Sequence, residues 1–225
     1  MQASNQQSAI SNQQSPRRRL GIFGGSFNPV HYGHLLLAET CREQAGLDEV
    51  WFVPNSLSPL KQDQPPAAAR HRTEMLQLAT GGHESFRLST IEIDRGGISY
   101  TVDTLAEIAA QQPAAELYFL MGGDSLVDLP KWRDPRRICE LALPLVVRRH
   151  GSPEPRYEVF ASLLPAERLA LVRQMTVDMP IIELSASDLR RRAAAGLSLR
   201  YRTPRGVEKY IETHGLYTES TQPDS

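Results

Sequence analysis

The sequence lacks the features of an exported or membrane-spanning protein. Its 225 residues include only two cysteines, Cys41 and Cys139, which show no CxxC spacing, so no disulfide framework is expected. No apolar run approaches the roughly 20 residues of a membrane-spanning helix. An arginine cluster at 17–19 is followed by glycines, Asn28 and His31, which interrupt the apolar region that an export signal needs. We therefore expect a cytoplasmic protein with reduced thiols and no membrane partner.

An excess of charge of one sign is also absent. The chain has 25 Lys and Arg against 26 Asp and Glu, and its formal net charge is −1. This balance provides no basic field for nucleic acid, which we do not expect as a partner. The part from Lys131 onward is locally basic, with sixteen basic and twelve acidic residues, and it is suited to small anions.

The two ends of the chain hold too few apolar residues to join a core. Residues 1–18 are rich in Gln, Ser and Asn, so we expect a disordered tail there and a flexible tail at 218–225. The residues between them, 19–217, are expected to form one domain, whose last part, from about 185 to 217, is a small helical subdomain. We expect a monomer or a small homo-oligomer.

Short apolar runs alternate with helical patterns along the domain. Apolar runs that begin at Leu20, Val50, Leu117 and Leu143 are typical of strands buried on both faces. The alternation predicts an α/β fold with a doubly wound parallel sheet, helices on both faces, and ligands at the carboxyl ends of the strands. Further strands are expected at 86–93 and 181–184, and helices are expected at 33–45, 67–79, 101–111, 165–174, 187–195 and 204–214.

The loop after the first strand has the composition of a polyanion site. It contains Gly24-Gly25-Ser26 and leads to His31 and His34 at the start of a helix. Glycines allow the backbone to approach phosphates closely, and the free amides at a helix N-terminus carry partial positive charge. The loop matches neither the Walker A pattern nor GxGxxG. Zinc ligation, or simple packing or capping, are alternatives to phosphate contact for the two histidines.

Residues 25–34, GSFNPVHYGH, resemble the GxFxPxHxGH signature of the nucleotidyltransferase superfamily related to class I aminoacyl-tRNA synthetases, and every fixed position is met. Residues 184–190, LSASDLR, resemble the ISxxxxR motif of the same superfamily, with Leu184 in place of isoleucine. Ser185 and Ser187 precede a helix that can hold a phosphate, and Arg190 adds charge about one turn later. Alone, the second pattern is more typical of a helix cap. The resemblance implies a Rossmann-like sheet that binds ATP.

The loops between these two motifs resemble those of the bacterial nicotinate-mononucleotide adenylyltransferases. The resembling stretches are 54–55, 99–101, 121–125 and 130–132, and the likeness runs from about Leu20 to Leu216. The sequence departs from the family at Leu60, which stands beside Lys61 where the family often has a histidine, so a phosphate contact of Lys61 is less well supported.

The resemblance implies transfer of the adenylyl group of ATP to nicotinate mononucleotide, with Mg²⁺ bound mainly through the ATP phosphates and no metal ligands from the protein. The phosphate of the acceptor is the nucleophile, so the protein acts by positioning and charge stabilisation. The implied catalytic residues are His31, His34 and Arg190. The implied ATP contacts are Gly24, Gly25, Ser26, Phe27, Gly122, Asp124, Arg149, Ser185 and Ser187, and the implied acceptor contacts are Asn55, Lys61, Tyr100, Thr101 and Trp132.

Two other functions are open from the sequence. One is a related transferase that uses phosphopantetheine, nicotinamide mononucleotide or a cytidylyl donor. The loops at 99–101 and Trp132 disfavour this alternative. The other is a non-catalytic nucleotide-binding regulator, which the presence of both histidines and Arg190 disfavours. For single residues, ordinary packing is the alternative at Tyr100 and Trp132, and a turn is the alternative at Asp124.

Overall fold

A parallel sheet forms the centre of the molecule. The computed structural model describes residues 17–57, 66–149 and 154–218. Six strands within these residues pair in the order β3-β2-β1-β4-β5-β6, and every pairing is parallel. The predicted fold class is therefore confirmed. The strands are β1 (Arg18–Gly25), β2 (Glu49–Pro54), β3 (Phe86–Leu88), β4 (Ala115–Gly122), β5 (Leu143–Arg149) and β6 (Val177–Met179).

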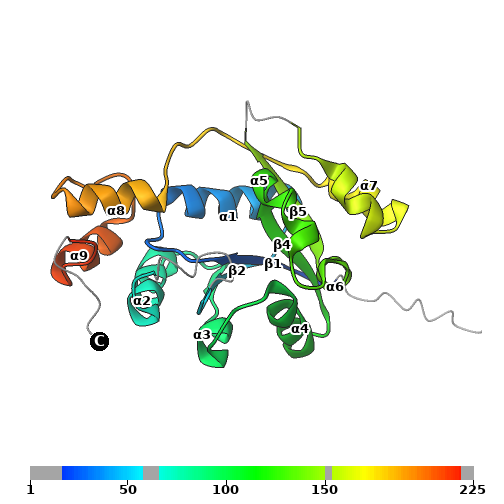
Figure 1. Ribbon diagram of the computed structural model, residues 1–225, viewed down its shortest axis with the longest axis horizontal. Coiled ribbons are helices and arrows are strands. Elements are labelled where there is room, and N and C mark those ends of the chain that lie inside the picture. The colour runs from blue at the N-terminus through cyan, green and yellow to red at the C-terminus, as the bar shows by residue number, and fades with distance from the viewer. Residues whose placement is uncertain (1–16, 58–65, 150–153, 219–225) are drawn as a thin grey trace, which may run out of the picture.

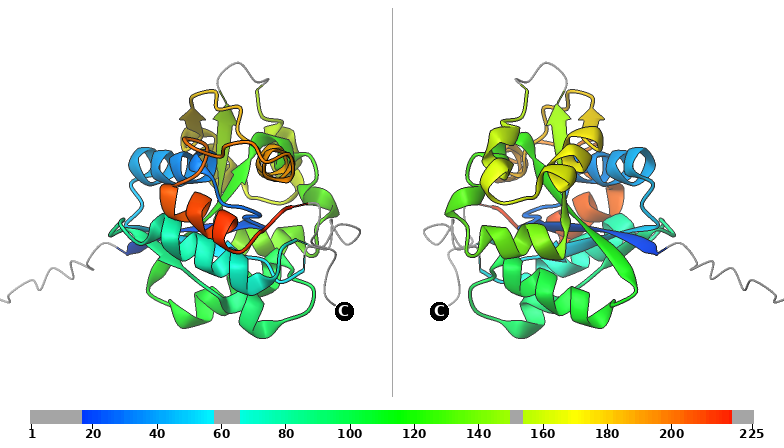
Figure 2. Two further views of the ribbon diagram at one scale, coloured as in Figure 1. Left: turned by 90° about the vertical axis from the view of Figure 1, so that its left-hand side faces the viewer. Right: turned by 90° about the vertical axis from the view of Figure 1, so that its right-hand side faces the viewer.

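Helices cover both faces of this sheet. Figure 1 shows α1 (Tyr32–Ala45) on one face, and α3 (Ile91–Arg95) and α4 (Thr101–Gln111) on the other. Figure 1 shows α8 (Ala186–Ala194) and α9 (Arg205–Thr213) at the same end of the molecule as α2, and Figure 2 shows α9 packed along α2. The remaining elements are α2 (Ala69–Thr80), α5 (Gly123–Leu126), η1 (Leu129–Lys131), α6 (Pro135–Leu141), η2 (Tyr157–Ser162) and α7 (Ala166–Gln174).

Each face of the sheet has its own apolar core, because successive side chains of a strand point to opposite faces. On β1, Phe23 packs into the core beneath α1, whereas Ile22 packs into the core beneath α4. Each fully buried side chain of this kind contributes about 1.5–3 kcal/mol. Gly21 leaves no room for a larger residue, since a Cβ there would lie 2.7 Å from the side chain of Leu47. These contacts fix β1 between the two cores, and so fix the point at which its loop begins.

The sheet also contains a topological switch point. The chain moves from β1 to β2 on one side and later places β4 on the other side of β1. The loops that follow β1 and β4 consequently diverge at the carboxyl edge, which is where doubly wound sheets bind their ligands.

One predicted strand is too long, and another is wrong. The strand expected at 86–93 ends at Leu88, and the helix α3 follows and stops at Gly96, which has φ 69°. The run at 181–184 is not a strand, and the edge strand is instead β6. The predicted tails lie outside the described residues except for 17–18 and Thr218, and Arg18 already belongs to β1.

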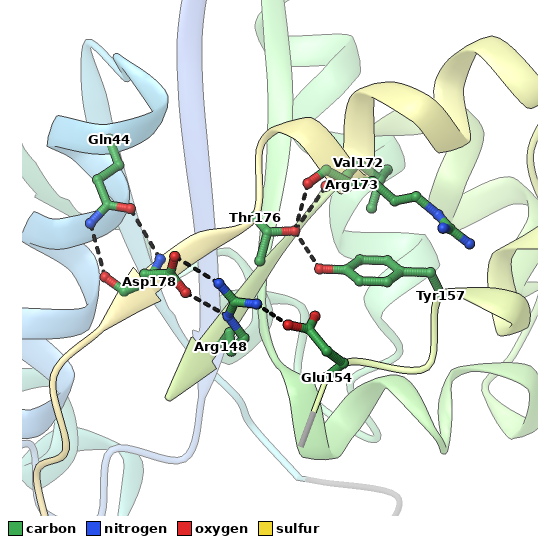
Figure 3. A network of polar contacts seen from close by, with 8 residues as sticks. All are labelled: Gln44, Arg148, Glu154, Tyr157, Val172, Arg173, Thr176 and Asp178. Atoms are coloured by element: carbon green, nitrogen blue, oxygen red, sulfur yellow. Dashed lines mark hydrogen bonds and ion pairs between the residues drawn. The ribbon is translucent and has the colours of Figure 1, made fainter. Parts of the chain in front are cut away.

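The edge strand β6 is held by side chains from two neighbouring elements (Figure 3). Gln44, near the end of α1, donates to the backbone carbonyl of Asp178 at 2.9 Å and accepts the Asp178 N–H at 3.0 Å. The Asp178 carboxylate accepts two hydrogen bonds from the guanidinium of Arg148 on β5, at 2.6 and 2.9 Å. Arg148 also pairs with Glu154. These contacts fasten a strand of only three residues to the sheet.

The two cysteines form no disulfide bond with each other. Cys41 in α1 and Cys139 in α6 are buried and unpaired. Burial raises the pKa of both thiols to about 12, which makes them poor nucleophiles at neutral pH. Among the helices of the described residues, none has the length and apolar character needed to cross a membrane.

Candidate active site

The loop between β1 and α1 is anchored by an aromatic side chain. Phe27 has φ 45° and its side chain is only 1% exposed. Its ring meets Phe23 edge-on at a centroid distance of 5.3 Å and His34 at 5.1 Å. A Cβ on Gly25 would lie 3.1 Å from the same ring, so glycine fits there best. Phe27 can therefore meet a ligand only through its backbone.

His31 and His34 stack on each other at the start of α1. Their ring centroids lie 3.8 Å apart and their planes are inclined by 26°. The backbone N–H of His31 donates to Nδ1 of His34 at 3.2 Å. Gly33 makes room for this pair, because a Cβ there would lie 3.0 Å from the His31 ring. The two imidazoles thus form one unit that leads from the loop into the helix.

Both imidazoles are neutral near pH 7. Burial lowers the pKa of His31 to about 4. Burial, together with the neighbouring His31, lowers the pKa of His34 to about 3. Because Nδ1 of His34 accepts a hydrogen bond, the single proton of the neutral ring lies on Nε2. His34 therefore caps the loop with one nitrogen and keeps the other as a donor.

Arg190 joins the second predicted stretch to this loop. Its Nη1 donates to the backbone carbonyl of Asn28 at 2.8 Å, although the two residues are 162 positions apart in the chain. Its Nη2 donates to the hydroxyl of Ser187 at 3.4 Å. Ser185 is the N-cap of α8 and accepts the Asp188 N–H at 3.1 Å. The structure thus brings the N-terminus of α8 to the loop that carries the histidines.

The loop after β2 connects this region with the start of α4. The N–H of Asn55 donates to the carbonyl of Gly25 at 3.0 Å, and the N–H of Ser56 donates to the hydroxyl of Ser99 at 3.1 Å. Tyr100 precedes α4, and Thr101 is its first residue. The loop that carries Asn55 is therefore joined by a hydrogen bond to the segment that carries Tyr100 and Thr101.

The segment that carries Trp132 lies beside the start of α4. Its ring meets Phe119 of β4 edge-on at 5.9 Å. The next residue, Arg133, places its guanidinium 4.8 Å from the ring centroid of Tyr100 and pairs with Asp103 of α4 at 3.2 Å. These two contacts hold the segment that carries Trp132 beside the beginning of α4.

The remaining predicted residues are placed only by their backbone. Gly122 ends β4, Asp124 lies in α5 and Arg149 ends β5, so all three belong to the carboxyl edge of the sheet. Lys61 lies outside the described residues. A cavity of about 890 Å³ lies against Arg18, Glu49 and other residues, and no predicted site residue lines it.

Residues 22–192 match the model of the cytidylyltransferase-like family. A relative from Thermomicrobium roseum, named a probable nicotinate-nucleotide adenylyltransferase, is 46% identical over 88% of this chain and 91% of its own length. The chain belongs to the nicotinate-nucleotide adenylyltransferases of this family. A relative from Rhodopirellula baltica with the same name is 38% identical over 88% of this chain and 92% of its own length.

A solved structure resembles this adenylyltransferase in fold. It is titled Plasmodium falciparum nicotinic acid mononucleotide adenylyltransferase complexed with NaAD, and it aligns with a TM-score of 0.67. The alignment covers 89% of this chain and 97% of that one at 17% identity, so it bears on the fold alone. Together with the relatives above, it makes the chain a nucleotidyltransferase with a Rossmann-like sheet.

One residue of this nucleotidyltransferase contacts the loops of the site without having been predicted from the sequence. Arg72 in α2 is 1% exposed and donates to the carbonyl of Ser26 at 3.0 Å. The helical pattern at 67–79 contains a signal for its burial: Arg72, Met75 and Leu76 follow the i, i+3, i+4 spacing of a core-facing stripe. An arginine in such a stripe is easily read as solvated, because arginine is rarely fully buried.

Proposed function

We propose that this enzyme transfers the adenylyl group of ATP to nicotinate mononucleotide and releases pyrophosphate, a step of NAD biosynthesis that yields nicotinate adenine dinucleotide. The observation that carries the proposal is the contact between Arg190 and the carbonyl of Asn28. It places the cation and the helix N-terminus of α8 against the loop of His31 and His34, which supplies donors for a triphosphate from both sides. The names of the relatives support the choice of acceptor.

The ATP side of the site works by donating hydrogen bonds and positive charge. The Nε2–H of His34 donates to a phosphate oxygen as negative charge builds on the leaving group, and His31 packs against its ring. Arg190 and the region of Ser185 and Ser187 hold the β- and γ-phosphates. The Ser185 hydroxyl accepts the Asp188 N–H and still has its own proton to donate.

The acceptor side of the site positions the nucleophile. A phosphate oxygen of nicotinate mononucleotide attacks the α-phosphorus in line, the bond to the bridging oxygen breaks, and pyrophosphate leaves with that electron pair. No general base is needed, since this phosphate is already ionised near neutral pH. We assign Trp132 to the nicotinate ring, and the backbone at Tyr100 and Thr101, where α4 begins, to its carboxylate.

We also infer that Mg²⁺ accompanies ATP. In the parts of the chain that the structure describes, no group of three or more His, Cys, Asp or Glu side chains could hold a metal ion. The available donors therefore suit an ion coordinated mainly by phosphates and water. When bound, the ion neutralises phosphate charge. The net charge of −1 supports small-molecule partners rather than nucleic acid, and we propose a cytoplasmic enzyme that is a monomer or small homo-oligomer.

The test is pyrophosphate release from ATP and Mg²⁺ with nicotinate mononucleotide, compared with nicotinamide mononucleotide and phosphopantetheine. We expect release with nicotinate mononucleotide to exceed release with the other two. Faster release with either of them would replace the proposed acceptor. Absence of release with every acceptor, from a chain that binds ATP, would refute the proposed reaction.

A further inference from the structure

We propose that Arg72 is a positioning residue that sets the ATP loop and the acceptor loop in their working orientation. This inference rests on the proposed function and adds to it a residue outside the two sequence motifs. Arg72 makes four hydrogen bonds from α2: to the carbonyl of Ala67 at 2.9 Å, to that of Ser26 at 3.0 Å, to Oδ1 of Asn55 at 3.4 Å and to the carbonyl of Ser56 at 3.5 Å. Its acceptors thus include the loops after both β1 and β2.

The bond to Ser26 orients a backbone donor of the ATP loop. In a planar trans peptide, the carbonyl of one residue and the N–H of the next point in opposite directions. Because the Ser26 carbonyl points inward to Arg72, the N–H of Phe27 points away from Arg72. That N–H finds no acceptor among the described residues. We infer that Arg72 keeps it directed toward the phosphates.

The bond to Asn55 orients a side chain of the acceptor loop. A guanidinium has donors only, so the atom of the Asn55 amide that faces it must be the oxygen. The NH₂ group of Asn55 is then turned away from Arg72 and is left to donate to the acceptor. The Asn55 N–H is itself bonded to the Gly25 carbonyl at 3.0 Å, so the two loops share one fixed arrangement.

The charge of Arg72 adds a second effect on ATP. The hydrogen bonds of Arg72 all go to neutral oxygens in the described part of the chain. Burial in this surrounding lowers its pKa, because the charged form is poorly solvated there. Glu92 and Tyr217 oppose this shift only in part, since the pKa of Arg72 stays lowered. A buried cation whose hydrogen-bond partners are neutral is stabilised further when an anion comes close. The triphosphate of ATP is such an anion, so ATP should bind more weakly once the cation is removed.

The experiment compares Arg72→Met with Arg70→Met, which removes an exposed arginine two residues earlier on the same helix. Circular dichroism and urea unfolding measure folding, and calorimetric titration measures ATP binding without any acceptor. We expect Arg72→Met to weaken ATP binding ~10-fold or more and to lower kcat/KM by ~100-fold. A folded Arg72→Met variant within about twofold of Arg70→Met in both measurements would overturn the inference.

Arg72→Lys provides the test if Arg72→Met does not fold. Lysine keeps the charge but lacks the planar fork that spans several acceptors. We expect the lysine variant to fold, to keep more of the ATP affinity than of kcat, and to lose ~10-fold or more in kcat/KM. Activity equal to that of the unchanged chain would overturn the inference.

A double-mutant cycle with Asn55→Ala separates positioning from a general structural role. If Arg72 orients Asn55, then Asn55→Ala should raise the acceptor KM in the unchanged chain and add little in the Arg72 variant. Fully additive losses would remove the acceptor loop from the inference. ATP binding is measured without any acceptor, so this test of Arg72 does not depend on which acceptor the enzyme uses. An unchanged chain that binds ATP but does not react with nicotinate mononucleotide would refute the proposed function. The comparison of ATP binding would still decide the role of Arg72.

Discussion

Two parts of the site are held in place by different kinds of contact. We call the loop of His31 and His34 the histidine half, and the segments of Tyr100 and Trp132 the acceptor half. In the histidine half, the His31 side chain is 5% exposed and the loop is fixed by Arg190 from a distant helix. In the acceptor half, Arg133 and Asp103 form an ion pair whose side chains are 58% and 41% exposed. Exposed pairs contribute only about 0–1 kcal/mol. The loop of His31 and His34 is thus held by buried contacts, whereas the segment that carries Trp132 is held beside α4 in part by an exposed ion pair.

This difference predicts different effects of substitutions in the two halves. Substitutions in the histidine half disturb packed rings and bonds between remote segments, so they should affect turnover strongly. Substitutions in the acceptor half should change the choice of acceptor with little effect on ATP. The variants below separate these two outcomes.

The largest effect is expected from His34→Ala. This change removes the Nε2–H donor, and we expect kcat to fall by more than ~100-fold, as for the loss of one donor to a transition state. Steady-state kinetics measures the loss, and circular dichroism verifies the fold. His83→Ala is the matched control, since His83 stacks on Phe86 at a centroid distance of 3.8 Å and lies outside the loop between β1 and α1. A folded His34→Ala variant with near-normal turnover would remove His34 from the mechanism.

A somewhat smaller effect is expected from Arg190→Ala. It removes the bond to the Asn28 carbonyl and the proposed contact with the ATP phosphates, so kcat/KM should fall by ~10- to 100-fold. The neighbouring Arg191→Ala is the control, because that side chain is 75% exposed and pairs with Asp188 within the same helix. We expect the control to stay within about threefold of the unchanged chain. Equal losses in both variants would show that the contact with Asn28 has no special role.

In the acceptor half, Trp132→Ala should act on one substrate. Loss of the aromatic plane is expected to raise the KM for nicotinate mononucleotide by ~3- to 10-fold, while the KM for ATP changes by less than ~2-fold. Both constants are obtained by varying one substrate at saturating levels of the other. Similar changes in both constants would indicate that Trp132 supports the fold rather than the acceptor.

The smallest effect is expected from pH near neutrality. The pKa of His31 is about 4 and that of His34 about 3, so kcat/KM should show no histidine titration between pH ~6 and ~8. An inflection near pH 6.5 that disappears in His34→Ala would contradict this.

The protein should become less stable as the pH falls below 6.5. Unfolded histidines titrate near 6.5 and the folded pair near 4 and 3, so the unfolded state binds protons first as pH falls. The free energy of unfolding should therefore decrease from pH 6.5 toward pH 4. His34→Gln should reduce this slope in urea unfolding series, and an unchanged slope would count against a neutral buried pair.

The elements that the sequence predicts well are those with a strong local pattern. The apolar runs that became β1, β2, β4 and β5 are long enough to be covered on both faces, and the helix expected at 101–111 matches α4. The strand β6 has three residues and depends on Gln44 and Arg148, which are remote in the chain. The apolar run at 181–184 misleads because Ile181 is 60% exposed and has no strand partner among the described residues.

The same reasoning applies to the site. The two motifs could be found because their residues are close together in sequence and have distinctive chemistry. The contact of Arg190 with Asn28 and the burial of Arg72 depend on how remote segments pack, and no local pattern shows which carbonyl oxygens an arginine will reach. Specific roles for Asp124, Arg149 and Lys61 stay predictions.

The pairing of Gln44 with Asp178 has a consequence for association between molecules. An unpaired edge strand can recruit a strand from another chain and so start aggregation. Here both backbone groups of Asp178, at the middle of β6, are already occupied by one amide side chain. A foreign strand could extend the sheet at this position only by displacing Gln44, so we expect this side chain to disfavour pairing of β6 with a strand of another molecule.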